Sequence, residues 1–399
     1  MAYLKNYCSL IIIFTITINS FSCKKSTSQK ENNIAVMAYY VPEKDYKPET
    51  LPLNQLTHII YSFTKVIDNE MKFNNAEHDK KLKQLVEQRK NHPDLKFMIA
   101  CGGWGSKGFS DMSFSPENRK KFVKSVVKFI KEYELDGLDI DWEYPCIPAA
   151  NTKARPEDKQ NFTFLMKELR QALNTLDRKQ TLTFASAGWK PYYKNIETTE
   201  VMKYVDYMNI MTYDQISGNS PFTGHHTPLG WIKNEHLKDS LVSDFYEEMT
   251  KRSADYGVEY EPGSAEMIVD YCIAQGVNPK QIVIGAAFYG KAWKGVSSAN
   301  DGLYQANKGA HATDSYRDIR KKYESNNNYK RYWDSIAKAP YLFSATDSIF
   351  ITYDDTVSVK LKTEYTIKNR LGGIMFWQLG HDVKEKNSLL NAIYNASEN

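Results

Sequence analysis

The sequence predicts a (β/α)8 (TIM) barrel with a small α+β insertion domain between the seventh strand and the seventh helix. Eight short apolar runs recur along the chain, and segments of helical periodicity separate most of them. Repeated βα units form parallel sheets, and eight such units close into a barrel. The tract 291–353 is too long for a loop and has helical and strand-like pieces of its own, which indicates an inserted domain.

The runs are dense in apolar residues because the strands of a parallel barrel are buried on both faces. The expected strands are 34–40, 56–66, 96–104, 136–145, 181–188, 204–214, 281–290 and 371–380. An open doubly wound sheet is the alternative architecture. It lacks support here, because no Gly-x-Gly-x-x-Gly motif follows the first strand.

Helical periodicity predicts helices over 78–90, 116–133, 156–176, 264–275 and 356–369. The helix at 116–133 has the clearest start, because Ser115 can cap it and Pro116 suits its first position. Between the sixth strand and its helix, residues 217–263 form a second long connection. The catalytic barrel is expected to comprise 34–399, with the insertion at 291–353 inside it.

The N-terminus reads as a targeting segment. Lys5 is followed by the short apolar run 10–21, which has the length of a signal peptide and not of a membrane span. Small residues before Cys23 and a polar tether after it are typical of a bacterial lipoprotein. We therefore expect residues 1–22 to be a signal peptide, Cys23 to carry lipid and 23–33 to be a tether. The protein would be exported and anchored to the cell envelope by that lipid alone; an ordinary secretory signal is the alternative.

The composition is that of a folded globular chain, with 42% hydrophobic residues, and the net charge of +4 gives no reason to expect nucleic acid as a partner. We expect a monomer. Cys101, Cys146 and Cys272 are too scattered for a disulfide framework or zinc site and are predicted to be small buried residues. His225 and His226 have no third ligand at a matching spacing, so no metal and no cofactor is expected.

The stretch 136–145 carries the chemistry. Asp139, Asp141 and Glu143 lie two residues apart, and side chains two apart share one face of a strand. Stacked carboxyl groups that cannot all ionise together indicate a site that handles protons. A metal-binding strand or a solvated edge strand is the alternative interpretation.

The motif Asp-x-x-Asp-x-Asp-x-Glu, followed by Tyr-Pro, resembles the active-site strand of the family 18 glycoside hydrolases, the chitinases and their relatives. Its acidic positions are Asp136, Asp139, Asp141 and Glu143. The resemblance implies that Glu143 is the general acid and base, and that the N-acetyl group of the substrate serves as the nucleophile. Asp141 would orient that acetamide, while Asp139 and Asp136 would lie deeper and tune the pKa values.

The resemblance extends to other residues at strand ends. Tyr213 would contact the acetamide carbonyl, and Trp377 would form the floor under the distorted sugar. The remaining substrate-binding residues that it implies are Tyr39, Gly103, Met211, Asp214 and Tyr289. Trp104 and Trp231 are candidates for stacking on sugar rings, with a buried structural role as the alternative for each. Two positions depart from the family pattern: Ala100 stands where a Ser is usual, and Lys291 where an Arg is common.

Three functions follow from these observations. The first is a retaining chitinase that acts on β-1,4-linked N-acetylglucosamine chains. The second is an endo-β-N-acetylglucosaminidase on N-glycans, against which the inserted domain argues. The third is a non-catalytic lipoprotein that binds chito-oligosaccharides, which the presence of Glu143 disfavours and the Ala100 departure keeps open.

Overall fold

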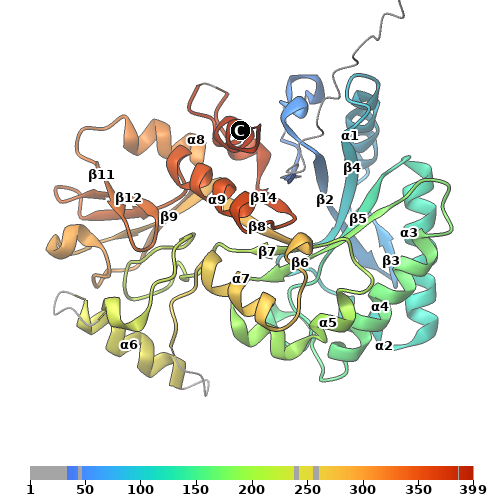
Figure 1. The fold of residues 1–399 in the computed structure, drawn as a ribbon, viewed down its shortest axis with the longest axis horizontal. Coiled ribbons are helices and arrows are strands. Elements are labelled where there is room, and N and C mark those ends of the chain that lie inside the picture. Colours follow the sequence, from blue (N-terminus) through green and yellow to red (C-terminus); the bar gives the residue numbers. More distant parts are fainter. Residues whose placement is uncertain (1–33, 44–46, 238–241, 255–259, 385, 399) are drawn as a thin grey trace, which may run out of the picture. The chain divides into compact units, whose positions relative to one another are not determined.

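The computed structural model describes residues 34–398 apart from 44–46, 238–241, 255–259 and 385, and these residues belong to one compact unit. The predicted signal peptide, Cys23 and the tether lie outside them. Among the described strands, a parallel set runs in the order β1-β14-β8-β7-β6-β5-β4-β2, and β1 also pairs with β2, so that the sheet closes on itself (Figure 1). The predicted (β/α)8 barrel is confirmed.

The barrel strands are β1 (Ala35–Tyr40), β2 (His58–Ile67), β4 (Lys96–Gly102), β5 (Gly137–Asp141), β6 (Thr181–Ala187), β7 (Tyr207–Met211), β8 (Ile282–Ala287) and β14 (Gly373–Trp377). The short β3 (Glu70–Lys72) extends the sheet by pairing antiparallel with the end of β2. Side chains that point inward, among them Met37, Ile60 and Met375, form a core inside the barrel. A larger core fills the space between the strands and the helices.

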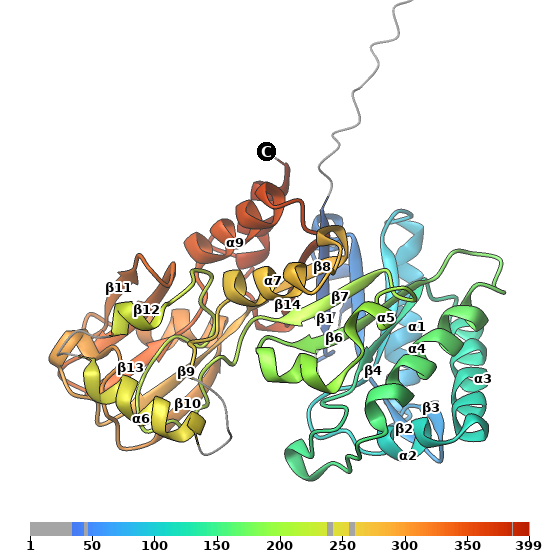
Figure 2. The same cartoon turned by 60° about the horizontal axis from the view of Figure 1, so that its bottom comes forward.

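The helices lie outside the strands (Figure 2). They are α1 (Glu77–Val86), α2 (Phe109–Phe114), α3 (Pro116–Glu132), α4 (Asp158–Leu173), α5 (Thr198–Val201), α6 (Ser243–Ala254), α7 (Ala265–Ala274), α9 (Thr356–Lys368) and α10 (Leu389–Glu398). Helix α3 begins as expected, because the Ser115 hydroxyl accepts a hydrogen bond from the Asn118 amide and Pro116 follows it. The described helices include none that is long and apolar enough to cross a membrane.

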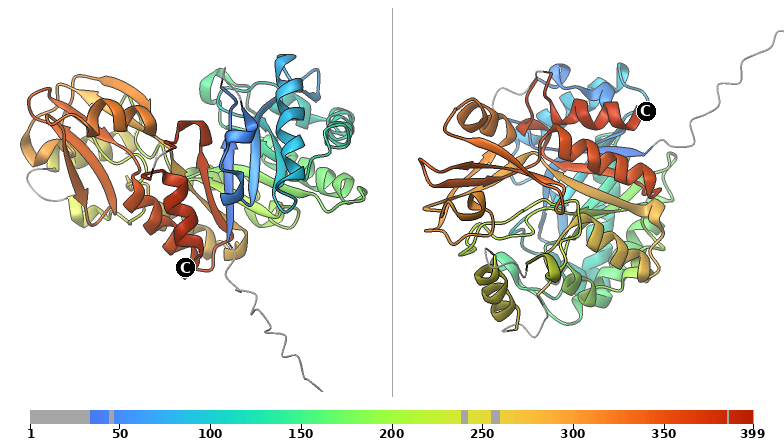
Figure 3. Two further views of the ribbon diagram at one scale, coloured as in Figure 1. Left: turned by 90° about the horizontal axis from the view of Figure 1, so that it is seen from above. Right: turned by 60° about the vertical axis from the view of Figure 1, so that its left-hand side comes forward.

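The insertion builds a second, antiparallel sheet beside the barrel (Figure 3). Its strand order is β10-β9-β13-β12-β11. The strands are β9 (Tyr289–Lys294), β10 (Ala310–Ser315), β11 (Lys330–Asp334), β12 (Ala339–Ser344) and β13 (Ile349–Thr352), and α8 (Tyr316–Ile319) follows β10. Packing in this sheet makes a separate apolar core around Trp293 and Phe350.

The structure changes several predicted boundaries. The run predicted as one strand over 281–290 is divided at Phe288 between barrel strand β8 and insertion strand β9. Strand β10 was not predicted, because its exposed, polar residues lack an apolar run; it is held by its pairing with β9. Helices α2, α6 and α10 were also not predicted, and α6 lies within the long connection 217–263.

Candidate active site

The carboxyl groups of strand β5 and its exit lie on one face, as the spacing predicts. Leu138, Ile140 and Trp142 are buried on the opposite face, where the Trp142 ring stacks on Phe109 at 5.4 Å between centroids. This split places Asp139 inside the barrel, and brings Asp141 and Glu143 successively closer to its mouth.

Asp139 is fully buried and is held by neutral hydrogen-bond donors. Its carboxylate accepts hydrogen bonds from the Tyr39 hydroxyl (3.0 Å), the Thr183 hydroxyl (2.5 Å) and the Asn209 amide (3.2 Å). Burial raises the pKa of Asp139 to about 6, although these hydrogen bonds oppose the shift. The cradle therefore fixes the position of this carboxyl group without neutralising it by a cation.

Asp141 lies between the other two carboxyl groups. Its side chain is buried, and its Oδ1 atom has no hydrogen-bond partner among the described residues. Burial raises the pKa of Asp141 well above its usual value, and the nearby Glu143 and Asp139 raise it further. A buried acceptor without a partner is costly, so this oxygen is suited to receive a donor from a bound molecule.

Glu143 stands just beyond the end of β5. Burial raises the pKa of Glu143 to about 7, a hydrogen bond with Tyr144 acts in the opposite direction, and the charge of Asp214 raises it further. A carboxyl group with this pKa exists in both the protonated and the ionised form near neutral pH, so it can donate its proton and take it back. Lys65 is the nearby cation, but its ammonium group donates to the Gly102 carbonyl at 2.5 Å.

A cleft of about 1120 Å³ opens over these groups. Of the residues predicted from sequence, Tyr39, Gly103, Trp104, Asp141, Glu143, Met211, Tyr213, Asp214, Tyr289 and Trp377 all line it. Asp139 lies below its floor, in the hydrogen-bonded cradle. Residues of the insertion, including Asp314 and Arg317, line the same cleft, so barrel and insertion both contribute walls.

Aromatic rings line the cleft in two groups. In the first, Trp377 stacks on Phe63 at 5.5 Å between ring centroids, and the Tyr39 ring lies 6.0 Å from the Trp377 ring. In the second, Tyr144 contacts Trp104 and Trp189. The Trp104 side chain is 66% exposed, which leaves a flat apolar face open to a ligand.

The end of β7 completes the wall above Asp141. The rings of Tyr213 and Tyr289 meet edge to face at 6.0 Å, and Tyr213 is partly buried beside Met375, with its hydroxyl 3.8 Å from the sulfur. Asp214 pairs with the Lys291 ammonium at 2.7 Å. Burial tends to raise the pKa of Asp214, but its contacts with His226 and Lys291 outweigh burial and hold that pKa well below its usual range.

A glycine pair lets β4 approach the acidic strand. Gly102 has φ +131°, and a Cβ atom placed there would lie 1.9 Å from the Asp141 carbonyl oxygen. Gly103 has φ +89° and packs against the Phe63 ring, which a Cβ atom would meet at 2.9 Å. Any other residue at Gly102 would displace the backbone that carries Asp141, and one at Gly103 would displace the Phe63 ring.

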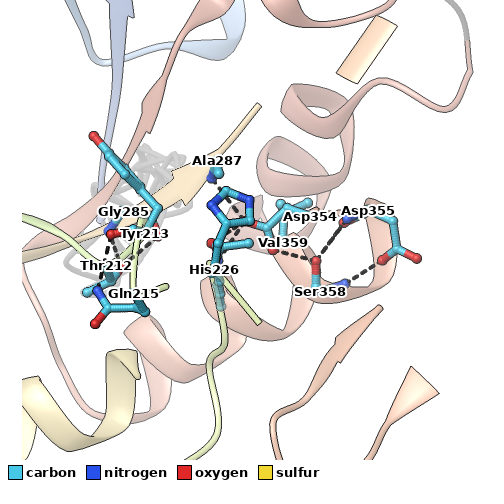
Figure 4. Close-up of polar contacts among 12 residues, drawn as sticks. Thr212, Tyr213, Gln215, His226, Gly285, Ala287, Asp354, Asp355, Ser358 and Val359 are labelled. Carbon is cyan, nitrogen blue, oxygen red and sulfur yellow. Dashed lines mark hydrogen bonds and ion pairs between the residues drawn. The ribbon is translucent and has the colours of Figure 1, made fainter. Parts of the chain in front are cut away.

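A buried ionic cluster lies behind the cleft wall, between β8 and α9 (Figure 4). The Asp354 carboxylate accepts hydrogen bonds from the Lys362 ammonium (2.6 Å), the Thr227 hydroxyl (2.9 Å), the Ala287 amide (2.9 Å) and the Ser358 hydroxyl (2.6 Å). We call these five residues the Asp354 cluster. The cluster links the segment that follows β13, the last strand of the insertion, to barrel strand β8.

His226 connects the Asp354 cluster to the cleft. Its Nδ1 lies 3.7 Å from Asp214 Oδ1, an electrostatic contact that is too long for a hydrogen bond, and its Nε2 lies 3.2 Å from the Tyr289 carbonyl oxygen. The next residue, Thr227, bonds both Asp354 and Lys362. His225 instead faces the insertion, 3.1 Å from Asp334. Within the described residues no group of His, Cys, Asp and Glu is arranged to hold a metal ion.

Asp136 lies deeper than the cleft carboxyl groups, before the start of β5, where Arg89 and Arg178 pair with it; its influence on their pKa values stays a prediction. Two other sequence-based interpretations need correction. Trp231 does not line the cleft, and its ring lies under the Lys190 ammonium against the barrel core. Cys146 is only partly buried, unlike Cys101 and Cys272.

Sequence reasoning missed several residues that line the cleft or hold Asp139 below it. Phe63 and Lys65 are near the end of β2, so the rule that strand ends carry the site could have found them. Thr183 and Asn209 lie inside apolar runs, where their polar side chains were the available signal. Glu43 and His381 lie in connections and Arg317 lies in α8 of the insertion, and no local pattern places these three residues at the cleft.

Comparisons with known proteins agree with this geometry. A family model described as glycosyl hydrolases family 18 matches residues 35–382. Chitinase A1 of Niallia circulans is 28% identical over 442 residues, which cover 95% of this chain and 61% of that protein. Chitinase B of Serratia marcescens is 31% identical over 408 residues, 86% of this chain and 77% of that protein. The chain thus spans less than two thirds of the length of Chitinase A1.

A solved structure extends the likeness to the fold. The structure of a glycoside hydrolase family 18 N-acetylglucosaminidase from Paenibacillus barengoltzii matches with a TM-score of 0.78 and 34% identity, over 91% of this chain and 100% of that chain. The likeness therefore includes both the barrel and the antiparallel sheet beside it.

Proposed function

This chain belongs to family 18 of the glycosyl hydrolases, and on that premise we propose that it hydrolyses β-1,4-linked N-acetylglucosamine chains with retention of configuration. The observation that carries the proposal is the pairing of Glu143, whose pKa is raised to about 7, with the unpartnered Oδ1 atom of buried Asp141. Together they offer a proton donor and an acceptor for an amide N–H in one cleft.

In the first step Glu143 donates its proton to the glycosidic oxygen, and the bond from that oxygen to the anomeric carbon breaks. The carbonyl oxygen of the substrate's own N-acetyl group attacks the anomeric carbon and forms a cyclic oxazolinium ion. Asp141 accepts a hydrogen bond from the acetamide N–H and stabilises the positive charge of the oxazolinium ion. The Tyr213 hydroxyl donates a hydrogen bond to the acetamide oxygen. No second carboxylate acts as a nucleophile.

In the second step a water molecule attacks the anomeric carbon and opens the ring, while the Glu143 carboxylate takes the proton of that water. Two inversions at one carbon leave the configuration unchanged. Asp139 is a positioning residue, since Tyr39, Thr183 and Asn209 hold it beside Asp141. Its partial charge helps to keep the pKa of Asp141 raised. Trp377 would support the sugar at which cleavage occurs.

Product analysis with wild type and Glu143→Gln tests the proposal. Both are incubated with N-acetylglucosamine oligomers and with an N-glycosylated protein. We expect wild type to hydrolyse the oligomers, and the variant to be slower by about 10²–10⁴-fold because the amide cannot donate the proton. Cleavage of the glycoprotein alone would select the N-glycan endoglycosidase. Binding of oligomers without cleavage by wild type would select the sugar-binding lipoprotein.

The proposed localisation rests on residues outside those that the structure describes. We propose that the chain is exported and that Cys23 carries the lipid anchor, on the basis of the apolar run 10–21 and the polar tether. Incorporation of labelled palmitate into wild type but not into Cys23→Ser would support this. Equal labelling of both, or of neither, would contradict it.

A further inference from the structure

The two ends of the cleft are lined by different residues. This inference rests on the proposed function, which assigns the leaving group to one end and the glycon to the other. In the proposed mechanism the sugar that is cut lies over Trp377, and the leaving group lies on the other side of the bond that Glu143 protonates. Tyr144 follows Glu143 in the chain and contacts Trp104 and Trp189, so this aromatic group is the place for the leaving group. The glycon, the part of the chain toward the non-reducing end, then extends past Trp377 toward the loop that follows β14.

Charged groups from two elements meet at that glycon end. Glu43 follows β1, and Arg317 lies in α8 of the insertion; Arg317 Nη2 and Glu43 Oε1 are 3.1 Å apart. Both residues line the cleft. A Cβ atom on Gly380, in the loop after β14, would lie 3.4 Å from the same Glu43 oxygen. The barrel rim and the insertion are thus joined across this end.

At the same end of the cleft, His381 has a buried ring nitrogen, Nδ1, that lacks a hydrogen-bond partner among the described residues. Its side chain lines the cleft. Burial, with Arg317 nearby, lowers the pKa of His381, so the ring is neutral near pH 7 and has one donor and one acceptor nitrogen. A sugar hydroxyl can serve as partner for either nitrogen.

The ion pair is poorly explained as a stabilising contact. The side chains of Arg317 and Glu43 are 48% and 53% exposed, and exposed pairs contribute little to stability. The position of the pair has a clearer consequence. Gly380, which lies beside Glu43, is three residues beyond Trp377 in the chain, so the Cα atoms of Trp377 and Gly380 are at most about 10 Å apart. The glycon side is therefore short.

We propose that Glu43, Arg317 and His381 close the glycon end of the cleft and hold the non-reducing terminal sugar, so that the protein releases short units from that end of an N-acetylglucosamine chain. These three residues, which we call the terminal clamp, are specificity determinants and take no part in bond cleavage.

The position of the first cut tests the clamp. The hexamer of N-acetylglucosamine is hydrolysed in ¹⁸O-water, so that each new reducing end is labelled and early product masses identify the broken bond. Wild type should favour one bond close to the non-reducing end. Glu43→Gln, Arg317→Met and His381→Phe should each raise the share of internal cuts, by up to about fivefold for the ion-pair variants.

Two further variants separate the clamp from a general disturbance. The charge swap Glu43→Arg with Arg317→Glu should restore the terminal preference, because it re-forms the pair. Arg320→Met removes an arginine that follows α8 in the chain and pairs with Glu324 away from the cleft, and it should leave the cut positions unchanged. Equal use of internal and terminal bonds by wild type, or identical profiles for wild type and all three clamp variants, would overturn the proposal.

A binding measurement decides the clamp separately from turnover. In Glu143→Gln, calorimetry compares the hexamer with a hexamer whose non-reducing end carries an added β-1,4-galactose. The clamp predicts weaker binding of the capped hexamer, and recovery of that binding when Arg317→Met is added. If no oligomer is hydrolysed, the proposed function fails, yet this difference still supports the clamp. Equal binding of both hexamers overturns the clamp even if hydrolysis occurs.

Discussion

Two carboxylate clusters lie on either side of the cleft wall, and they differ in whether a cation is paired with the carboxylate. In the Asp354 cluster a fully buried ammonium group, that of Lys362, pairs with the carboxylate, and neutral donors satisfy its remaining lone pairs. In the cleft cluster, Asp139 and Asp141 are buried and Glu143 is partly buried. None of the three has an ion pair among the described residues, and burial raises the pKa of each.

The difference indicates that the Asp354 cluster serves stability and the cleft cluster serves proton transfer. A buried carboxylate that is paired with a cation and fully hydrogen-bonded has its charge compensated, so it can hold two elements together. Carboxyl groups that lack a cation partner must share protons, which costs stability but creates a group able to donate near neutral pH. His226 links the two clusters, since its ring lies near Asp214 and the next residue bonds Asp354.

The largest effect is expected from Lys362→Met, which removes the cation and leaves Asp354 buried and charged. We expect the free energy of unfolding to fall by about 3–5 kcal/mol. Urea denaturation followed by far-UV circular dichroism measures the change. Lys360→Met is the matched control: it lies on the same helix, its pair with Glu364 is exposed, and it should cost less than about 0.5 kcal/mol.

If Lys362→Met and Lys360→Met cost the same, the Asp354 cluster is not the stabilising element that the comparison requires. The double variant Asp354→Asn with Lys362→Met sharpens the test. Because it removes the uncompensated charge, it should be more stable than Lys362→Met alone.

An intermediate effect is expected from Asp214→Asn, which acts on the cleft cluster through charge. The negative Asp214 raises the pKa of Glu143, and its removal also leaves the Lys291 cation without its partner. Both changes lower the pKa of Glu143, so the protonated form is lost at a lower pH. The alkaline limb of kcat/KM should move down by about one pH unit.

The pH dependence of kcat/KM on an N-acetylglucosamine oligomer measures that shift. Glu200→Gln, which removes a surface carboxylate paired with Lys203, should leave the profile unchanged. An alkaline limb that stays in place or moves upward in Asp214→Asn would show that Asp214 does not set the charge around Glu143.

The smallest effect is expected from Ala100→Ser, which restores the hydroxyl that is usual in the family. Ala100 pairs in register with Asp139, and both are fully buried, so the new hydroxyl would lie on the same face as the carboxyl cluster. A donor to a carboxylate lowers its pKa, and one hydrogen bond is worth about 1 kcal/mol.

The acidic limb of kcat/KM should therefore move to lower pH by about 0.7 unit in Ala100→Ser, since one pH unit corresponds to about 1.4 kcal/mol. Ala100→Cys adds a similar volume with only a weak donor and should shift the limb less. Equal shifts in both variants would attribute the effect to packing.

The prediction of the acidic strand succeeded because its information is local. Alternation with a period of two residues decides which side chains share a face, so the relative placement of Asp139, Asp141 and Glu143 was readable before any fold was known. The eight barrel strands were found for a similar reason, since burial on both faces leaves an apolar run in the sequence.

Other contacts had no local signal. Tyr39 reaches Asp139 across 100 residues of sequence, and Asn209 reaches it across 70. Arg317 meets Glu43 only because the insertion folds back onto the rim beside β1. Asp136 belonged to the same motif as the cleft residues, yet the length of the strand placed it at the far end, against Arg89.

The barrel, the inserted domain and the carboxyl groups aligned on one strand were therefore readable from the sequence, because burial and backbone periodicity act on neighbouring residues. Which carboxylates receive a cation, and which remain without one, was readable only from the three-dimensional arrangement of the chain. That choice depends on where distant segments come together in space: Lys362 reaches Asp354, while the Lys65 ammonium binds the Gly102 carbonyl and leaves the oxygen of Asp141 open.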